Sequence, residues 1–495
     1  MISGLDPEAL ERARVSRDPR FDGKFFIAVT STGIYCRPIC PSRYAKRAHV
    51  RFFGTPAAAE AAGFRPCLRC RPEAAPGTPA WIGTAAVVRR ALRLINEGAL
   101  DEGSVEELAA RLGIGARHLL RLFGRHVGAS PTAVAQTRRL HFAVCLLEDT
   151  NLPITQIALA AGFGSSRRFN DAFRNTYQRS PRDLRRARRR GGADQRSEEV
   201  VLRLAYRPPY DWNHMREFLA ARAVAGVERV DARGYARTVA CEGGHALICV
   251  APLPGEDALQ LRVTGAPPAA LLQLSSVARR VFDLAADPAR IGSELSKDQL
   301  VGPLVRARPG LRIPGAWDAF ECAVRAILGQ QVSVAAGRTF ASRLVERAGR
   351  AVRGGGEGLT HLFPSAANIA GADLAGLGLT RSRAASLYAL ARAVLERRVN
   401  FSAAPAQLGD ALAALPGIGP WTAQYVLLRA LGEPDALPSA DLVLRRMAAP
   451  PHKMLSGKQL DERAKEWQPW RSYAVMHLWR AAAGAVPARI AGASL

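Results

Sequence analysis

The chain has 495 residues, of which 48% are hydrophobic, and it carries a formal net charge of +26. This length predicts several domains, and the charge favours a polyanionic partner such as nucleic acid, although a GC-rich genome would also raise the arginine content. The sequence has no uninterrupted apolar run of about 18 residues, which excludes a membrane span. Its first residues lack the basic and apolar regions of a signal peptide, so a cytoplasmic, DNA-associated bacterial protein is expected.

Four of the eight cysteines lie close together near the start of the chain. They form two pairs, Cys36-x3-Cys40 and Cys67-x2-Cys70, with 26 residues between the pairs. Two thiolate pairs at this spacing fit a tetrahedral Zn²⁺ ion. A disulfide scaffold is disfavoured in so long a chain without a secretory signal. The alternative is a group of four buried free thiols.

The residues around these cysteines resemble the N-terminal domain of the Ada family. The resemblance rests on Asp22–Phe26, Thr30–Pro38 and Gly63–Cys70. It implies that Cys36 is both a zinc ligand and the nucleophile that takes a methyl group from a methylated DNA phosphate. Methylation would remove one negative charge from the centre and tighten DNA binding. A purely structural zinc site is the alternative. Three side chains are candidates for contacts to the DNA backbone: Thr32, Arg43 and Arg47. Of these, Arg43 is the best match to a family position.

A helical pattern in the next part of the chain repeats at an offset of 49–50 residues. In each copy a glycine turn, Gly113–Gly115 or Gly162–Gly164, lies between a short apolar helix and a basic helix, which is the order of a helix-turn-helix motif. Ser104 and Glu107 form a capping box before the first copy. The pair resembles the AraC-type DNA-binding domain, and an ordinary helical bundle with solvated arginines is the alternative. The second helices would present these side chains to a major groove: Arg117, Arg121, Arg167, Arg168 and Asn170.

From residue 198 onwards, short alternating runs are followed by helical periodicity that prevails from Ser275. The segment resembles the N-terminal α+β domain of the AlkA family, especially at Pro208–Trp212 and Phe218–Ala223. One helix is expected over Asp211–Ala223. Strands are expected at four runs: Val200–Leu204, Tyr235–Val239, Ala246–Val250 and Leu259–Val263.

Two apolar helical runs flank the turn Pro416–Pro420. Gly417 and Gly419 let the backbone turn tightly and approach another molecule closely. The helix expected from Thr422 offers unpaired N–H groups to a phosphate oxygen. Asp441, which follows Gly417 by 24 residues, is a lone carboxylate before an apolar segment. On these residues alone, a non-specific DNA clamp followed by a helix-capping aspartate fits equally well.

This stretch resembles the helix-hairpin-helix DNA glycosylases, and in particular the AlkA branch that removes alkylated purines such as 3-methyladenine. The resemblance covers nearly all of residues 198–490. It implies that Asp441 catalyses cleavage of the glycosidic bond of a flipped-out base and that Gly417, Gly419 and Thr422 bind the DNA. The carbonyl groups that match a monovalent-cation site belong to Ala413, Leu415 and Ile418. The positions that match the substrate pocket are Phe218, Gln331, Trp421, Tyr425 and Trp479.

The sequence departs from these families at several positions. Trp421 stands where lyase-type relatives have a Schiff-base lysine, so a monofunctional glycosylase is expected. Gln331 replaces the leucine that fills the DNA stack, and Leu442 and Arg480 replace aromatic residues near the site. The cysteines outside the cluster lack the Pro-Cys-His-Arg context of an O6-alkylguanine methyltransferase.

The sequence therefore predicts a multidomain protein with four parts. Residues 1–75 form a small α+β zinc domain, 81–190 an all-α AraC-type double helix-turn-helix, 198–275 the α+β AlkA N-terminal domain and 276–490 an all-α helix-hairpin-helix glycosylase domain. Linkers or inserts are expected at Glu73–Pro79, Arg185–Gly192 and Arg353–Gly356.

The expected function is a zinc methylphosphotriester sensor and transcriptional regulator fused to an alkyl-base glycosylase. Expected partners are double-stranded DNA with alkylated bases, methylphosphotriesters or promoter sites, and RNA polymerase; no membrane is involved. The expected cofactors are Zn²⁺, with structural and nucleophile-activating roles, and a monovalent cation at the hairpin. The competing hypothesis is a regulator whose C-terminal half binds DNA without catalysis.

Overall fold

The computed structural model describes residues 6–76, 86–101, 103–188, 199–353, 356, 358–450 and 452–485. Within these ranges no helix is long and apolar enough to cross a membrane. The expected boundary at Arg185–Gly192 and the expected insert at Arg353–Gly356 lie partly outside the described residues. The chain divides into two compact units: the first is Met1–Arg207, Val239–Arg279 and Leu284–Ala286, and the second is Pro208–Thr238, Arg280–Asp283 and Asp287–Leu495.

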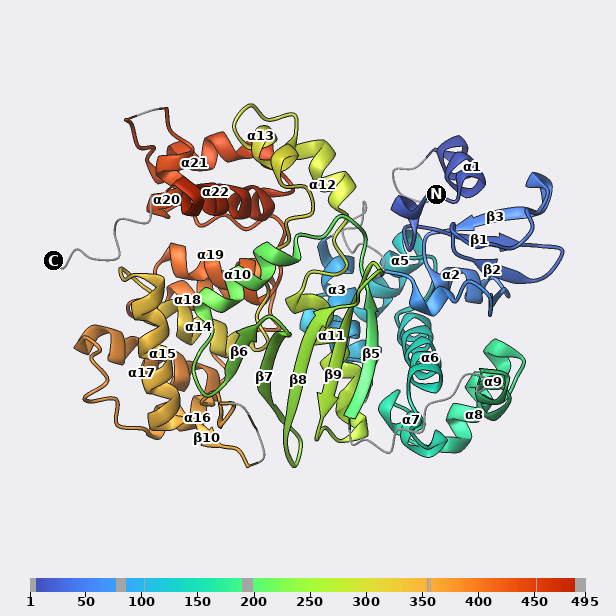
Figure 1. Ribbon diagram of the computed structural model, residues 1–495, viewed down its shortest axis with the longest axis horizontal. Coiled ribbons are helices and arrows are strands. Elements are labelled where there is room, and N and C mark those ends of the chain that lie inside the picture. Colours follow the sequence, from blue (N-terminus) through green and yellow to red (C-terminus); the bar gives the residue numbers. More distant parts are fainter. Residues whose placement is uncertain are drawn as a thin grey trace. The chain divides into compact units, whose positions relative to one another are not determined.

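The first unit begins with a small module, called here the cysteine module (residues 6–76), whose sheet has the strand order β3-β1-β2-β4 (Figure 1). Strand β1 pairs antiparallel with β2 and β3, and β4 pairs parallel with β2. Phe26, Ala28 and Tyr35 pack into one core of this module, and Phe25 and Ile27 pack into another. Its elements are α1 (Pro7–Ser16), η1 (Pro19–Phe21), β1 (Phe26–Val29), β2 (Ile34–Cys36), η2 (Arg47–His49), β3 (Val50–Phe53), α2 (Pro56–Ala61), β4 (Arg65–Pro66) and η3 (Pro72–Ala74).

The end of this module differs from the prediction. The sequence indicated a linker at Glu73–Pro79, but Glu73 is 9% exposed and lies in η3. Pro76 is buried as well, whereas residues 77–79 lie outside the described part. The linker prediction is therefore wrong for its first half, because a short polar and alanine-rich run carries no sign of what packs on it.

The predicted helix-turn-helix pair is present in the first unit. The capping box of Ser104 and Glu107 is formed, and Gly113 ends the first short helix in the left-handed conformation. On the buried side of helix α8, the ring of Phe169 meets that of Phe173 edge-on, and Phe173 stacks on Tyr177. The elements are α3 (Ala86–Asn96), α4 (Val105–Leu112), α5 (Ala116–His126), α6 (Pro131–Asp149), α7 (Ile154–Ala160), α8 (Ser166–Tyr177) and α9 (Pro181–Arg188).

The first unit also contains strands from the later part of the chain, called here the strand module. Strand β5 (Glu199–Ala205) pairs antiparallel with β9 (Ala258–Thr264), which pairs antiparallel with β8 (Gly244–Pro252). These are three of the predicted strands, and their alternating apolar residues are buried. The turn η4 (Pro268–Ala270) and helix α11 (Leu271–Val281) follow.

The second unit is mainly helical. The fourth predicted strand lies in β7 (Gly234–Cys241), which begins in this unit and pairs with β6 (Glu228–Asp231), a strand that the sequence did not predict. Helix α14 (Ala319–Leu328) is buried along most of its length and packs against α15, α17 and α19. Most of its residues are apolar, as expected for a helix at such a central position, and the two charged ones are Glu321 and Arg325.

The other elements of this unit are mostly helices (Figure 1). Helix α10 starts one residue after the predicted position, capped by Asp211. The bounds are α10 (Trp212–Arg222), α12 (Pro288–Leu295), α13 (Val301–Ala307), α15 (Val334–Ala348), β10 (Arg350–Ala351), β11 (His361–Leu362), α16 (Ala366–Gly371), α17 (Arg381–Leu395), α18 (Pro405–Ala413), α19 (Pro420–Ala430), α20 (Leu442–Met447), α21 (Gly457–Arg463), η5 (Ala464–Trp467) and α22 (Arg471–Ala485).

Candidate functional site

The predicted hairpin joins α18 to α19 in the second unit. Gly417 has φ +75°, and a Cβ atom there would lie 2.1 Å from the hydroxyl of Ser386, so only glycine fits. Gly419 has φ −91° and open space beside it, so it is the N-cap of α19 rather than a strained turn residue. The Gln330 amide donates to the Gly417 carbonyl and to the Thr422 hydroxyl, both at 2.9 Å.

Two details of the hairpin differ from the prediction. Helix α19 begins at Pro420, two residues before the predicted start. Thr422, a predicted DNA contact, is 2% exposed, and its hydroxyl accepts the Gln330 hydrogen bond. Its side chain therefore supports the hairpin from inside.

Asp441 is the N-cap of α20, and its carboxylate is also held by two indoles. Oδ1 accepts a hydrogen bond from the Leu444 N–H at 2.9 Å and from Trp479 Nε1 at 3.3 Å. Oδ2 accepts one from Trp421 Nε1 at 2.9 Å. The helix-cap interpretation and the site interpretation are thus both correct for this residue, and together these bonds fix the direction of the carboxylate.

Three aromatic rings from two helices stand beside Asp441. The rings of Trp421 and Tyr425, one helical turn apart on α19, stack with centroids 5.2 Å apart. Trp479 on α22 lies 6.2 Å from Tyr425 and is tilted by 48°. With Asp441 these rings line a cavity of about 510 Å³, a volume typical of small-molecule sites.

Phe218 was expected in this pocket as a further aromatic face, but it is only 8% exposed. The guanidinium of Arg222 lies 3.7 Å from the centre of its ring, and that of Arg429 lies 4.6 Å from it. Both arginines line the cavity. The guanidiniums therefore stand in front of the ring, and Phe218 acts as their support.

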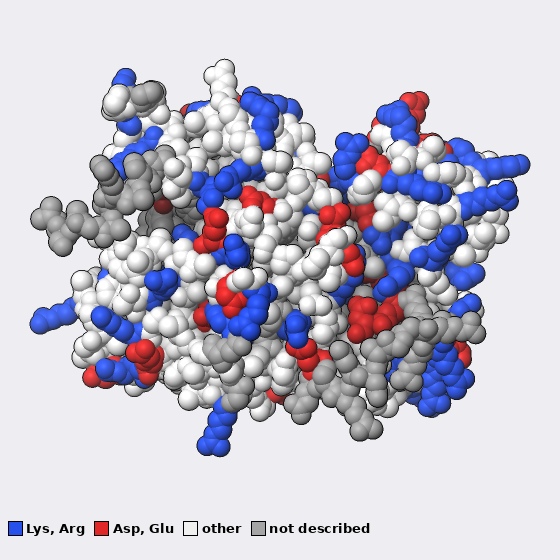
Figure 2. Space-filling view, viewed as in Figure 1, with Lys and Arg blue, Asp and Glu red and all other residues white. Residues whose placement is uncertain are grey.

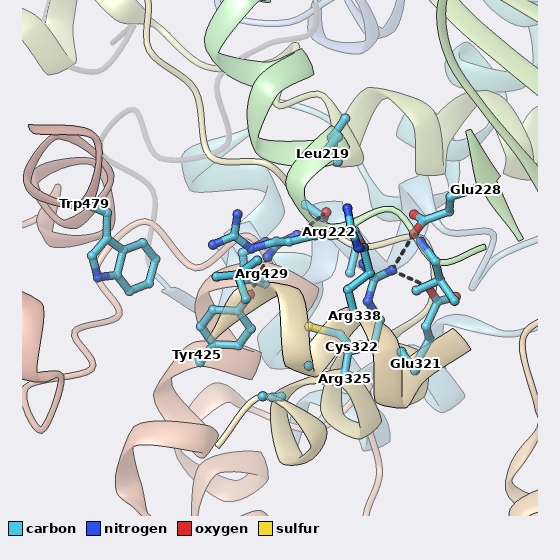
Figure 3. Close-up of a pocket in the computed structure, with 18 of the residues that line it drawn as sticks. Leu219, Arg222, Glu228, Glu321, Cys322, Arg325, Arg338, Tyr425, Arg429 and Trp479 are labelled. Atoms are coloured by element: carbon cyan, nitrogen blue, oxygen red, sulfur yellow. Dashed lines mark hydrogen bonds and ion pairs between the residues drawn. The ribbon is translucent and has the colours of Figure 1, made fainter. Parts of the chain in front are cut away.

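The far side of the cavity is lined by charged side chains (Figure 3). Arg237 donates to Glu321 at 2.8 Å, and Arg325 donates at 2.9 Å to both Glu228 and Glu321. Burial alone would raise the pKa of Glu228, but the guanidiniums of Arg325 and Arg237 lower it. Burial lowers the pKa of Arg222.

Three predicted or divergent positions remain: Gln331, Leu442 and Arg480. Gln331 is exposed in the turn between α14 and α15, with φ +55°. Leu442 is 55% exposed, and Arg480 pairs with Glu217 at 2.6 Å. Gln331 is thus free to reach a bound partner, whereas Arg480 is already paired.

The four cysteines meet because β2 and β4 run parallel in register. Tyr35 is opposite Pro66, so the next residues, Cys36 and Cys67, lie side by side, and Cys40 and Cys70 follow in the turns. Their sulfur atoms all lie within 4.8 Å of one another. Four thiolates this close require a cation, and the set fits tetrahedral Zn²⁺. Cys36 is partly exposed, whereas the other three are buried.

The predicted DNA contacts of the first unit are mostly on its surface. Arg43, Arg117, Arg121, Arg167 and Arg168 are exposed, and Asn170 is half-buried with its amide bonded to the Ser166 carbonyl. Figure 2 shows lysine and arginine side chains gathered over the cysteine module and over α8 and α9.

Two arginines of the cavity, Arg222 and Arg429, were not predicted from the sequence although each follows an aromatic pocket candidate. Each follows an aromatic residue by four positions on a helix: Phe218 on α10 and Tyr425 on α19. Side chains four residues apart share one helix face, so an arginine at this spacing could have been assigned to the same pocket.

Four family models match successive parts of the chain. They are the "Metal binding domain of Ada" at residues 9–73, the "Helix-turn-helix domain" at 108–187, the "AlkA N-terminal domain" at 201–318 and the "HhH-GPD superfamily base excision DNA repair protein" at 324–471. These matches confirm the predicted fusion and its mixed fold class.

Individual relatives agree with these models. A Mycobacterium tuberculosis protein with the name "Probable bifunctional transcriptional activator/DNA repair enzyme AlkA" is 41% identical over 478 residues, 96% of each chain. The DNA-3-methyladenine glycosylase 2 of Escherichia coli is 37% identical over 284 residues, 56% of this chain and 95% of that one. The structure of the 3-methyladenine DNA-glycosylase from Archaeoglobus fulgidus covers 57% of this chain and 98% of its own, with a TM-score of 0.51 and 21% identity, which shows a shared fold. The chain belongs to the family of bifunctional transcriptional activator/DNA repair enzymes AlkA.

Proposed function

We propose that the second unit excises alkylated bases of the 3-methyladenine type from double-stranded DNA. One observation carries the proposal: the Asp441 carboxylate, held by the indoles of Trp421 and Trp479, lies at a cavity lined by aromatic rings. A base inside a duplex is out of reach, so the nucleotide is flipped into the cavity first.

The two sides of the cavity suggest how the base is held. An alkylated purine such as 3-methyladenine is cationic, and an aromatic face attracts a cation by about 0.5–2 kcal/mol. The stacked rings of Trp421 and Tyr425 supply such a face. The guanidiniums of Arg222 and Arg429 repel the same charge, so the cationic ring is expected against the stacked pair and away from them.

Asp441 would act on the sugar. As the bond between C1′ and the base nitrogen breaks, its electron pair leaves with the base and positive charge develops on the sugar. The carboxylate stabilises this charge and orients a water molecule, whose oxygen bonds to C1′ while one of the water protons is released to the solvent. Because Trp421 has no amine, no Schiff base forms there, and the product is an abasic site in an uncut strand.

Gln331 and the hairpin would hold the distorted DNA. The exposed Gln331 would fill the gap left by the flipped nucleotide and hydrogen-bond its former partner. Gly417 and Gly419 bring the hairpin backbone to the phosphates, and the carbonyls of Ala413, Leu415 and Ile418 are candidate ligands for a monovalent cation. The Leu415 carbonyl accepts the Ile418 N–H at 3.2 Å and has a second lone pair for an ion.

The cysteine module would act as the sensor. A zinc ion would keep the Cys36 sulfur as a thiolate, and the partial exposure of this residue admits a substrate. Attack on a methylphosphotriester forms the S–CH₃ bond, breaks the O–CH₃ bond and leaves a phosphodiester with the electron pair. Arg43 would contact the DNA backbone there. The helix-turn-helix pair would bind a promoter through Arg117, Arg121, Arg167, Arg168 and Asn170 and place the protein beside RNA polymerase.

The test of the repair function compares Asp441→Asn with wild type and with Asp461→Asn, an exposed control on α21. Asparagine still caps a helix, so the fold should be kept. Single-turnover release of 3-methyladenine from alkylated duplex DNA should fall by about 100-fold or more in Asp441→Asn, the range for loss of one electrostatic stabiliser. Equal release by all three proteins would favour a regulator whose second unit binds DNA without catalysis.

The sensor function has a separate test. Transfer of labelled methyl groups from methylphosphotriester DNA should be lost in Cys36→Ala and kept in Cys249→Ala, which alters a cysteine outside the cluster. If Cys36→Ala accepted labelled methyl groups at the wild-type level, Cys36 would not be the nucleophile, and the role of the zinc site would be structural only.

A further inference from the structure

A fully buried arginine joins two modules of the first unit. Arg207 follows β5 and is 1% exposed. Its guanidinium donates to the carbonyl of Asp22 at 3.1 Å, to that of Pro76 at 3.4 Å and to that of Ala285 at 2.9 Å. The first two carbonyls belong to the cysteine module, and the third lies beyond α11 on the side of the strand module. A buried guanidinium is costly unless its donors are paired, and here carbonyls from both modules pair them.

The main chain around this arginine is packed too closely for any side chain at Gly23. This residue has φ +71°, and a Cβ atom there would lie 2.1 Å from the Pro76 carbonyl oxygen and 3.0 Å from Arg207 Nη2. The Asp22-Gly23 backbone, the end of the cysteine module and Arg207 therefore form one fitted contact.

The same contact leads to the cysteines. The carboxylate of Asp22, which is 4% exposed, accepts two hydrogen bonds from the Arg37 guanidinium, one of them at 2.9 Å. The Arg37 backbone N–H donates to the Cys70 sulfur at 3.3 Å, and Arg37 Nη1 donates to the Cys70 carbonyl at 3.1 Å. Asp22 thus contacts Arg37, which binds Cys70, through its side chain, and contacts Arg207 through its carbonyl.

Helix α6 adds further contacts within this unit. It packs against η3 and α2 of the cysteine module and against β5 of the strand module. Arg71 of the cysteine module forms an ion pair with Glu148 of α6, and Arg138 of α6 donates to Ser276 of α11 at 3.4 Å. The helix-turn-helix region therefore supports the same arrangement.

We propose that the cysteine module docks on the strand module as an intramolecular partner, with Arg207 as the anchor. The link from Cys70 through Arg37 and Asp22 then makes the residues around Arg207 and Ala285 respond to the state of the cysteine cluster. This inference rests on contacts of the first unit alone, so it stands whether or not Asp441 is catalytic.

The test is hydrogen–deuterium exchange on the full chain for wild type, Arg207→Met and Arg207→Lys. Arg262→Met is the matched control, because Arg262 is a solvent-facing arginine of the neighbouring strand β9. Arg207→Met should speed exchange about tenfold, which is a loss of roughly 1.4 kcal/mol of protection. The change should appear in the cysteine module, at residues 22–26 and 72–76, and also on the side of the strand module, at residues 204–210 and 284–287. Arg207→Lys should give a smaller change at the same places, and Arg262→Met none.

Two results would overturn the proposal. In the first, Arg207→Met changes exchange only in residues 204–210 and 284–287, which would make Arg207 a local residue of the strand module. The second uses wild-type protein and so does not depend on the folding of a variant. After zinc is removed by a chelator, exchange should rise in residues 204–210 and 284–287; unchanged exchange there would mean that the cysteine cluster is not linked to Arg207.

Discussion

The cysteine cluster and the Asp441 cavity are built in opposite ways. The four sulfur atoms come from one short stretch of chain, and one parallel strand pair brings them together. The cavity takes its side chains from many elements, among them β6, β7, α10, α14, α15, α19, α20 and α22, between Leu219 and Ala483. A local site can be organised by its ion, whereas a distributed site needs the helices to be packed before any of its chemistry exists.

The two sites also differ in how they handle charge. The cluster concentrates negative charge, so it depends on a cation. The cavity distributes charge over paired groups, with Arg237 and Arg325 between Glu228 and Glu321. Removing one cysteine should therefore prevent the cluster from binding its ion. Removing one charged side chain beside the cavity should instead leave its partner buried and unpaired.

The largest expected effect comes from breaking the cluster. Cys67→Ala should reduce bound zinc from one ion per chain to none and should abolish cooperative folding of the cysteine module, since structural zinc contributes about 10–16 kcal/mol in zinc-finger peptides. Zinc analysis and limited proteolysis of the full chain measure this. Cys241→Ala, outside the cluster, should change neither. Base excision should stay within about twofold, because the two sites share no side chain; loss of excision would contradict their independence.

A second change tests the charges beside the cavity. Glu321→Gln leaves the guanidinium of Arg237 short of its main buried partner and should lower the free energy of unfolding of the second unit by about 3–5 kcal/mol. Urea unfolding measures this value. Glu294→Gln, which breaks an exposed pair with Lys297, should cost less than about 1 kcal/mol. Similar costs for both variants would show that the buried network contributes no more than a surface pair.

Acid should destabilise the same unit through two buried histidines. Burial lowers the pKa of both His214 and His477 to about 4. In the unfolded chain they titrate near the ordinary value of about 6.5, so between these pH values the unfolded state binds more protons. Stability is therefore complete above about pH 6.5 and falls as the pH approaches 4, by about 1 kcal/mol for each histidine between pH 7 and 5.5.

Urea unfolding at both pH values checks this sign. Replacing His214 and His477 with asparagine should remove most of the pH dependence. Replacing the exposed His452 should leave it unchanged. If the double variant kept the full pH dependence, other groups would be responsible for it.

The sequence predicted the features that repeat or alternate, and it missed those that depend on partners distant in the chain. The four strands, the helix-turn-helix pair and the cysteine spacing follow from local patterns. Strand β6 was missed because Glu228, Arg229 and Asp231 give it no apolar alternation, although arginines from other elements pair with Glu228.

The same reason explains the corrections within the site. Phe218 carries no sign that Arg222 and Arg429 will cover its ring. Thr422 carries no sign that Gln330 will bind its hydroxyl. Asp441 could be recognised only by resemblance, because its two indole donors come from other helices and no spacing rule places them there.

The smallest effect separates ring stacking from hydrogen bonding at Asp441. Trp421→Phe keeps an aromatic ring next to Tyr425 but removes the donor to Oδ2, so base excision should fall by about tenfold, equivalent to about 1.4 kcal/mol. Trp479→Phe removes the longer bond, 3.3 Å against 2.9 Å, and should cost less. Single-turnover excision of 3-methyladenine measures both. A larger loss of activity in Trp479→Phe than in Trp421→Phe would mean that Trp479 holds the carboxylate in the reactive complex. In that case helix α22, rather than the hairpin helix α19, would set the direction in which Asp441 faces the sugar.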